Sequence, residues 1–117
     1  FTEFKGALTE QYVHQQLLAE CGITSYYWSN PDGRSEVDFI FQNGMDIIPL
    51  EVKAEKNQKA KSLKFYCQKF QPPKAIRTSM MDFGHDTITV DTVDTKVSFS
   101  YEMINLPLYA ISQIQKV

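Results

Sequence analysis

The chain has 117 residues, of which 43% are apolar and 22% are charged, and its formal net charge is −2. These proportions are typical of an ordinary globular domain, and they exclude a disordered or fibrous chain. The length suffices for one hydrophobic core without disulfide or metal support. We therefore treat residues 1–117 as a single domain.

Several classes of protein are excluded by what the sequence does not contain. No apolar run approaches the roughly 20 residues that a helix needs to cross a bilayer, and the first residues of this sequence lack the charged-then-apolar pattern expected of a cleaved leader. The glycines form no phosphate-binding loop ending in Gly-Lys-Ser/Thr, so ATP hydrolysis by that route is excluded. Cys21 and Cys67 are predicted to be buried free thiols in a reducing compartment. We expect a soluble, cytoplasmic protein.

Helical periodicity opens the chain. Within residues 2–21, Val13, Leu17 and Cys21 recur at steps of four residues and predict the buried face of a helix. Glu10 lies three positions before Val13 on the same stripe, where a carboxylate is costly unless something satisfies it. Glu10 either reaches water or a lysine from the edge of that stripe, or it points at a metal ion or its waters.

Three strands are predicted after this helix. The first covers residues 25–30, which are rich in aromatic side chains, and the next two cover 37–41 and 47–52, where apolar residues alternate at period two. Val37, Phe39 and Phe41 are expected on one face of their strand. Each of the last two strands then has one apolar face and one face that carries charge.

A hairpin between the last two strands predicts which charges lie together. If Asn43-Gly44 forms the two-residue loop of a type I′ turn, Asp38 lies opposite Pro49 and Glu36 lies opposite Glu51. Asp38 and Glu51 are then diagonal neighbours, roughly 7 to 8 Å apart and within reach of a shared divalent cation. Pro49 has no N–H for the ladder, so a bulge or a sheet edge is expected there.

A second helix and further strands complete the pattern. An amphipathic helix with Ala60, Leu63, Cys67 and Phe70 on one face is predicted to connect the Glu51 strand to a parallel strand at 74–79. Two weaker strands and a short terminal helix follow, at 87–90, 96–101 and 105–116. The terminal segment is expected to pack against the core. The expected fold class is α/β, with a mixed β-sheet flanked by helices.

Charge is distributed unevenly along the chain. Residues 53–77 hold eight basic residues against one acidic residue, a local charge of +7, and residues 82–102 hold five acids against one lysine, a local charge of −4. The basic segment is either the solvated face of the second helix or a surface for phosphate backbones. We predict that nucleic acid is bound by Lys56, Lys59, Lys61 and Lys64. No base-reading motif accompanies them, so recognition of a specific sequence is not expected.

The order of the charged residues resembles a known superfamily. Glu10 on the first helix, Asp38 on one strand and Glu51-Val52-Lys53 on the next are similar to the PD-(D/E)XK nucleases, which have a restriction-endonuclease-like core. More narrowly, residues 5–10, 35–39 and 48–53 resemble a domain of unknown function that follows the ATPase module of archaeal-type AAA proteins. The resemblance implies that this chain, which begins at Phe1, is excised from the C-terminal part of a longer ATPase-containing protein.

The resemblance also implies a site for Mg²⁺ or Mn²⁺. Asp38, Glu51 and the Val52 carbonyl would be the metal ligands, and Lys53 would orient the attacking water and stabilise charge in the transition state. Glu10 would add an outer contact or serve a second metal. Glu36 points the same way as Asp38 on a regular strand and could ligate in its place. Alternatively, Glu51 and Lys53 form only a salt bridge on an exposed sheet face.

Two functions follow from these residues. The first is a metal-dependent nuclease domain that hydrolyses DNA phosphodiesters without sequence specificity. The second is a catalytically inactive module that keeps the nuclease fold and binds nucleic acid or a partner for the attached ATPase. A toxin-type or restriction-type effector shares the chemistry of the first function and differs from it only in context.

Overall fold

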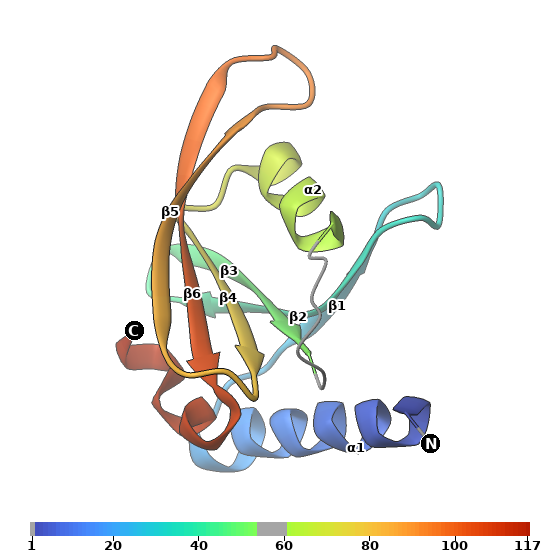
Figure 1. The fold of residues 1–117 in the computed structure, drawn as a ribbon, viewed down its shortest axis with the longest axis vertical. Coiled ribbons are helices and arrows are strands. Elements are labelled where there is room, and N and C mark those ends of the chain that lie inside the picture. The colour runs from blue at the N-terminus through green and yellow to red at the C-terminus, as the bar shows by residue number, and fades with distance from the viewer. Residues whose placement is uncertain (1, 54–60) are drawn as a thin grey trace.

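The computed structural model describes residues 2–53 and 61–117 (Figure 1). The described residues form one mixed sheet of six strands in the order β1-β2-β3-β4-β6-β5. Helix α1 (Thr2–Gln15), its π-helical extension η1 (Gln16–Glu20) and the 3₁₀ segment η2 (Leu108–Lys116) pack on one face of the sheet, and helix α2 (Lys61–Phe70) packs on the other. The expected α/β class, a mixed sheet flanked by helices, is confirmed.

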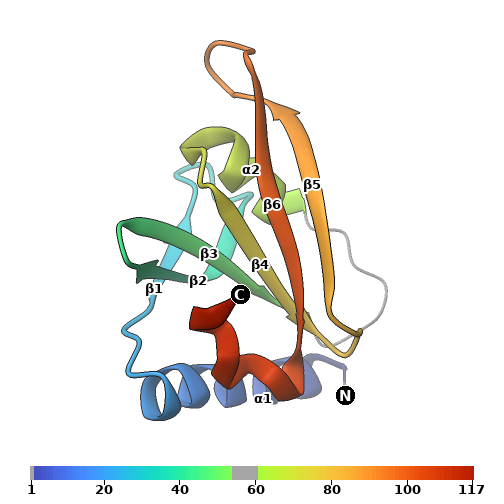
Figure 2. The ribbon, with the colours of Figure 1, turned by 90° about the vertical axis from the view of Figure 1, so that its left-hand side faces the viewer.

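Strands β1 to β4 lie side by side in the sheet in the order in which they occur along the chain. The antiparallel meander consists of β1 (Tyr26–Ser29), β2 (Glu36–Asn43) and β3 (Asp46–Val52). Strand β4 (Lys74–Ser79) is parallel to β3, and β6 (Ser98–Pro107) is parallel to β4 and antiparallel to the edge strand β5 (Gly84–Asp91). The strand expected at 74–79 and its parallel pairing are both confirmed. The β5–β6 hairpin extends beyond the rest of the sheet (Figure 2).

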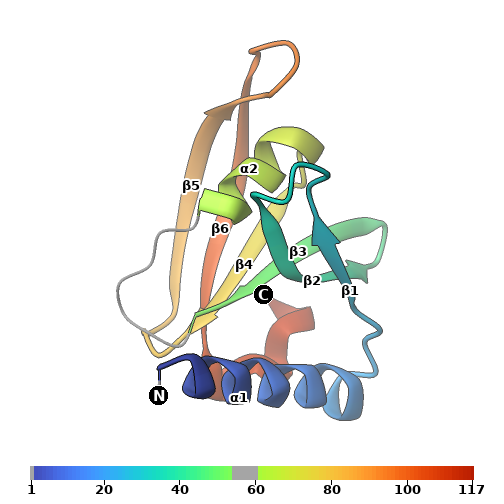
Figure 3. The ribbon, with the colours of Figure 1, turned by 90° about the vertical axis from the view of Figure 1, so that its right-hand side faces the viewer.

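Apolar side chains from the two faces of the sheet form two cores. The first core joins Val13 and Leu17 of the N-terminal helix to strand residues such as Leu50 and Ile76. The second lies under α2, which packs on the other face of the sheet (Figure 3), and it contains Leu63, Tyr66 and Cys67 of that helix. Because both faces are covered, a charged side chain in the central strands is withdrawn from water wherever it points.

The second helix differs from the expected pattern in one aromatic residue. Leu63 and Cys67 are buried as predicted, but Phe70 is 48% exposed and packs edge-on against Trp28, with 5.6 Å between ring centroids. Tyr66 occupies the buried position instead. Ala60 lies outside the described residues. Cys67 is a buried free thiol as predicted, whereas Cys21 is free but only half-buried.

Two boundaries in the second half of the chain were predicted wrongly. The strand expected at 96–101 begins at Ser98, because Lys96 adopts φ +57° in the preceding turn. The helix expected from Asn105 begins only at Leu108, because residues 105–107 continue β6 and pair with β4. The terminal segment nevertheless packs on the core as expected, with Ile111 and Ile114 buried.

The turn between β2 and β3 also differs from the prediction. Asn43 pairs with Asp46, so the two loop residues are Gly44 and Met45. Gly44 has φ +65°, whereas Met45 is not among the residues with positive φ. A positive φ confined to the first loop residue is the pattern of a type II′ turn, because a type I′ turn requires it at both positions. The pairing register is therefore two residues away from the predicted one.

Substitution of this turn glycine should destabilise the protein. We expect Gly44→Ala to lower the free energy of unfolding by about 1 kcal/mol, because an L-residue at this φ is strained. The control is Gly6→Ala in α1, where no atom lies within 4 Å of an added Cβ, and which should raise the free energy by about 0.5 to 1 kcal/mol. Urea denaturation measures both, and equal effects of the two substitutions would contradict the assigned turn.

Candidate functional site

An irregularity in the pairing of β2 with β1 positions Asp38. Tyr26 pairs with Ile40 but Trp28 pairs with Val37, so three steps along β2 match two steps along β1. The extra residue is a β-bulge that falls between Val37 and Ile40, in the segment that contains Asp38. Bulges bend a strand locally and re-aim its side chains.

The bulge changes which side chains share a face. Val37 and Ile40 contact the core under α2, whereas Phe39 and Phe41 lie in the core on the α1 side. The expectation that Val37, Phe39 and Phe41 share one face was therefore wrong. Asp38 and Phe39 are consecutive in the chain, yet both line a cavity beneath α1.

Of the two alternatives expected at Pro49, a bulge or a sheet edge, the structure shows the second. Pro49 pairs regularly with Ile40, and the pairing of β3 with β4 begins only at Leu50. Pro49 thus lies on a stretch of β3 that has a strand neighbour on one side only, where a missing N–H is tolerated.

Strands β2 and β3 part where the charged residues begin. The last regular pair is Phe39 with Leu50, and beyond it the Val52 N–H donates to Asp38 Oδ2 at 3.4 Å. Asp38 is the next residue of β2 beyond Phe39, so in this register it comes level with Glu51 of β3 and not with Pro49. The Asp38 carboxylate thus accepts a backbone N–H of β3 at the place where the ladder ends.

Glu51 lies on the other side of β3 from the α1 core. Leu50 and Val52 belong to that core, and alternation places Glu51 on the α2 side, beside Arg77 of β4. Glu51 is only 7% exposed. Its Oε1 lies 3.1 Å from Lys53 Nζ, and its Oε2 lies 3.8 Å from Arg77 Nε. Glu51 and Lys53 therefore form the salt bridge that was considered as an alternative, in a buried rather than an exposed place.

Two polar atoms at this position are buried without a hydrogen bond. Neither Glu51 Oε2 nor Arg77 Nε has a hydrogen-bond partner among the described residues. Leaving a buried charged group unsatisfied costs free energy. Such orphaned atoms in a charged cluster indicate a site that is completed by something other than the protein.

The cavity under α1 has a volume of about 580 Å³ and gathers several of the expected acids. Glu10 and His14 reach it from α1, and Glu36 and Asp38 reach it from β2. Glu36 accepts a hydrogen bond from the Tyr27 hydroxyl. Glu51 and Lys53 do not line this cavity, so the expectation of one pocket holding all the charges and facing the first helix was wrong. Alternation along β3 directs Glu51 to the α2 side, whereas Asp38 lies beside Phe39 in this cavity and accepts the Val52 N–H.

The charges nevertheless influence one another across the sheet. Burial is the largest cause of the raised pKa of Asp38, and the neighbouring Glu36 carboxylate raises it too. The Val52 N–H and Lys53 lower the pKa of Asp38 in part. Burial likewise raises the pKa of Glu51, against Lys53 and Arg77, and Asp38 raises it further.

Glu10 belongs to the same electrostatic group. Partial burial, then Asp38 and Glu36, raise its pKa, and Lys53 lowers it. Lys53 is thus the cation that the three carboxylates share. The set expected from the sequence is brought together electrostatically, although not within one cavity.

The donor set is consistent with a hard cation that needs few protein ligands. Within residues 2–53 and 61–117, no three Asp, Glu, His or Cys side chains are grouped closely enough to hold a metal ion. Mg²⁺, however, often uses one or two carboxylates and several waters. Asp38 and Glu51 supply two carboxylates, and the orphaned Glu51 Oε2 is an oxygen that a cation would satisfy. Val52 enters the site through its N–H, and metal ligation by its carbonyl stays a prediction.

The predicted nucleic-acid-binding lysines are only partly described. Lys61 and Lys64 are exposed on α2 and line a cavity of about 390 Å³ together with Arg77. Lys56 and Lys59 lie outside the described residues. Arg77 was not among the site residues predicted from the sequence. The strand expected at 74–79 and its parallel pairing could have indicated it, because this pairing places Arg77 beside Glu51.

The raised pKa of Asp38 predicts how stability depends on pH. A carboxyl whose pKa is higher in the folded state favours the folded protein when protonated, so this contribution falls as pH rises above the unfolded value. We expect Asp38→Asn, which keeps an oxygen for the Val52 N–H, to be more stable than wild type at pH 7, with a gain that shrinks towards pH 4. Urea denaturation from pH 4 to pH 8 measures this.

The matched control has the opposite sign. The Arg34 N–H donates to the Asp32 carboxylate and is the largest cause of the lowered pKa of Asp32. Asp32→Asn should therefore be less stable than wild type at pH 7. If Asp38→Asn were destabilised at pH 7 in the same way as Asp32→Asn, this result would contradict the electrostatics described for the site.

Comparison with known proteins places the chain in a family. Residues 5–109 match the model of a family described as Domain of unknown function (DUF4143). None of the curated proteins matches the sequence. In the described part of the chain, the helices are too short or too polar to cross a membrane. Because the matched residues make up most of the chain, the protein belongs to the DUF4143 family.

Proposed function

We propose that the chain is a metal-dependent nuclease-like domain that hydrolyses DNA phosphodiesters without reading their sequence. The observation that carries this proposal is the coupled set of Glu10, Asp38, Glu51 and Lys53 where β2 and β3 part. Their order along the chain is that of the PD-(D/E)XK superfamily. In the parent protein we expect the domain to be attached to an AAA-type ATPase in the cytoplasm, which the free thiols of Cys21 and Cys67 support.

The two buried carboxylates would hold the metal ion. Asp38 and Glu51, with the Val52 carbonyl, are the residues proposed to bind Mg²⁺ or Mn²⁺. When bound, the ion supplies charge neutralisation at the phosphate and a more acidic water. Burial makes both anions unfavourable without a cation, which the raised pKa of each carboxyl reflects.

Lys53 is the residue best placed to act on the reacting phosphate. Its ammonium is held 3.1 Å from Glu51 and acts electrostatically on Asp38 and Glu10. A fixed ammonium can orient the attacking water and stabilise negative charge as it develops on phosphorus. Glu10, whose pKa is raised, can take a proton from that water more readily than an ordinary exposed carboxylate.

A second candidate is a nuclease-like module that binds without turnover. The observation in its favour is that Glu51 is nearly enclosed between Lys53 and Arg77, an arrangement that already offsets the charge of the carboxylate. In this case the charged cluster stabilises the fold, and the basic face of α2 binds nucleic acid or a partner protein.

Cleavage of DNA tests the first proposal. The purified chain should nick supercoiled plasmid with Mg²⁺ or Mn²⁺, and Lys53→Met should lower the rate by about 10²- to 10³-fold, because an organised charge donor is lost. The control is Lys116→Met, which removes an equal charge from the end of η2 and should leave the rate unchanged. Equal residual cleavage by wild type, Lys53→Met and Asp38→Asn would identify a contaminant and end the proposal.

Metal binding separates the two candidates without an activity assay. Isothermal calorimetry with Mn²⁺ alone should show binding to the wild-type chain that is lost in Asp38→Asn and kept in Asp32→Asn. Absence of binding at millimolar Mn²⁺ would favour the module that binds without turnover.

A further inference from the structure

We propose that Arg77 binds a phosphate of the DNA backbone, in the basic cavity between α2 and strands β4 to β6. This inference deepens the proposed function and rests on it for the class of substrate. It adds a DNA-binding residue outside the set of acids and lysine expected to carry the chemistry.

The guanidinium of Arg77 has hydrogen-bonding capacity that the protein does not use. Its Nε is buried without a hydrogen-bond partner among the described residues, and its nearest carboxylate oxygen lies 3.8 Å away on Glu51. That distance is too long for a hydrogen bond, so the pair is electrostatic only. A guanidinium has five donors in a fixed fork, which matches two oxygens of a phosphate.

The surroundings of Arg77 favour an anion on the α2 side. Among the residues that the structure describes, the cavity of about 390 Å³ is lined by Lys61, Lys64 and Arg77 against one acid, Asp86, which gives these residues a net charge of +2. The other described residues that line it are Leu63, Ile88, Tyr101 and Met103. Three cations around a partly apolar hollow attract a phosphate strongly, because the low dielectric of the walls strengthens the field.

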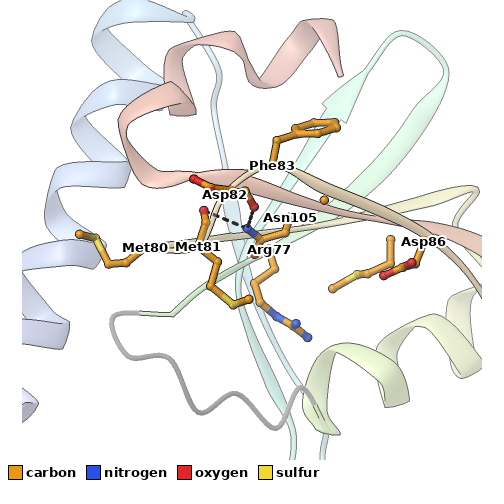
Figure 4. Close-up of a pocket in the computed structure, with 9 residues that line it drawn as sticks. Arg77, Met80, Met81, Asp82, Phe83, Asp86 and Asn105 are labelled. Atoms are coloured by element: carbon orange, nitrogen blue, oxygen red, sulfur yellow. Dashed lines mark hydrogen bonds between the residues drawn. The ribbon is translucent and has the colours of Figure 1, made fainter.

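A larger neighbouring cavity does not have this charge. It measures about 720 Å³ and shares Arg77, Asp86 and Met103 with the basic cavity, but Asp82 also lines it. Two acids against one arginine disfavour an anion there. Figure 4 shows the Arg77 side chain extending from β4 towards α2 and away from Phe83. The guanidinium is therefore directed to the basic side.

The wall next to Arg77 is held in place by a network centred on Asn105. The Asn105 amide donates to the carbonyls of Met81 and Asp82 at 3.3 and 2.9 Å (Figure 4). Its oxygen accepts from the Ser79 hydroxyl at 2.9 Å. These bonds fix the segment that follows β4, immediately beyond Arg77. This segment lines the larger cavity rather than the basic one, so the network fixes the side of Arg77 that faces away from the proposed phosphate.

The position of Arg77 relates the phosphate to the proposed chemistry. Arg77 is the strand partner of Glu51 in the parallel pairing of β4 with β3. A phosphate on Arg77 would therefore lie beside the Glu51–Lys53 pair, on the same face of the sheet. Phosphate contacts of this kind set the register of a strand without reading its bases, which agrees with the expected lack of sequence specificity.

Binding of a fluorescent DNA 20-mer in EDTA, followed by anisotropy over a range of salt concentrations, tests the inference without cleavage. Arg77→Gln should weaken binding about tenfold, as expected for loss of a charge-assisted contact, and should lower the salt slope by about 1. Arg34→Gln removes the same charge from an exposed turn and should bind like wild type. Arg77→Lys should lie between wild type and Arg77→Gln, because it keeps the charge but loses the fork.

A lysine pair on α2 keeps the test decisive if Arg77→Gln fails to fold. Lys64→Gln should weaken binding, whereas Lys69→Gln should not, because Lys69 lies outside the cavity and donates to Asn30. Equal effects of Lys64→Gln and Lys69→Gln, or equal affinity of Arg77→Gln and Arg34→Gln, would overturn the inference. No binding by wild type at low salt would overturn it as well.

Failure of this inference can be told apart from failure of the proposed function. Plasmid cleavage together with wild-type affinity in Arg77→Gln would remove the phosphate site and leave the nuclease proposal intact. Binding that depends on Arg77 without cleavage under any divalent metal would remove the nuclease activity and leave the phosphate site.

Discussion

The hydrogen bond from the Val52 N–H to the Asp38 carboxylate marks the point where β2 and β3 part, and the arrangement of the site depends on it. A regular ladder would satisfy that N–H with a carbonyl and would leave no place for a side chain between the strands. The bulge in β2 turns Asp38 into this position, where the side chain substitutes for the lost backbone acceptor. One extra residue against β1 thus leads to a carboxylate held at the end of a buried strand pair.

Burial of charge is the cost of this arrangement. Desolvation is the largest cause of the raised pKa of Glu10, Asp38 and Glu51, and Lys53 opposes it at all three. A single ammonium shared among three acids offsets their repulsion only in part. A fold under no functional constraint would gain stability by replacing such carboxylates with neutral residues, and natural sites commonly trade stability for function in this way. The orphaned Glu51 Oε2 and Arg77 Nε add to this cost on the α2 side.

The local sequence pattern predicted the helices and strands well, but it predicted strand register and the facing of side chains less well. The strand at 74–79 and its parallel pairing followed from periodicity and the intervening helix, and so did the burial of Val13 and Leu17. The bulge at Asp38 could not be read from β2 alone, because it exists only in the pairing with Tyr26 and Trp28 of β1. The register of the β2–β3 hairpin depended on whether Gly44 alone takes a positive φ. Residues 105–107 remain extended because they pair with β4. The candidate site residues could be named from the sequence because residue type is local, whereas the face on which Asp38 lies could not be predicted.

Glu10, Asp38 and Glu51 form one electrostatic unit governed by Lys53, although Glu51 does not line the cavity that holds the other two acids. Carbon-13 NMR titration of the side-chain carboxyls in wild type and Lys53→Met measures this directly. We expect the pKa values of all three groups to lie above the ordinary range in wild type and to rise further in Lys53→Met. Independent titrations near ordinary values, unchanged by the substitution, would contradict it.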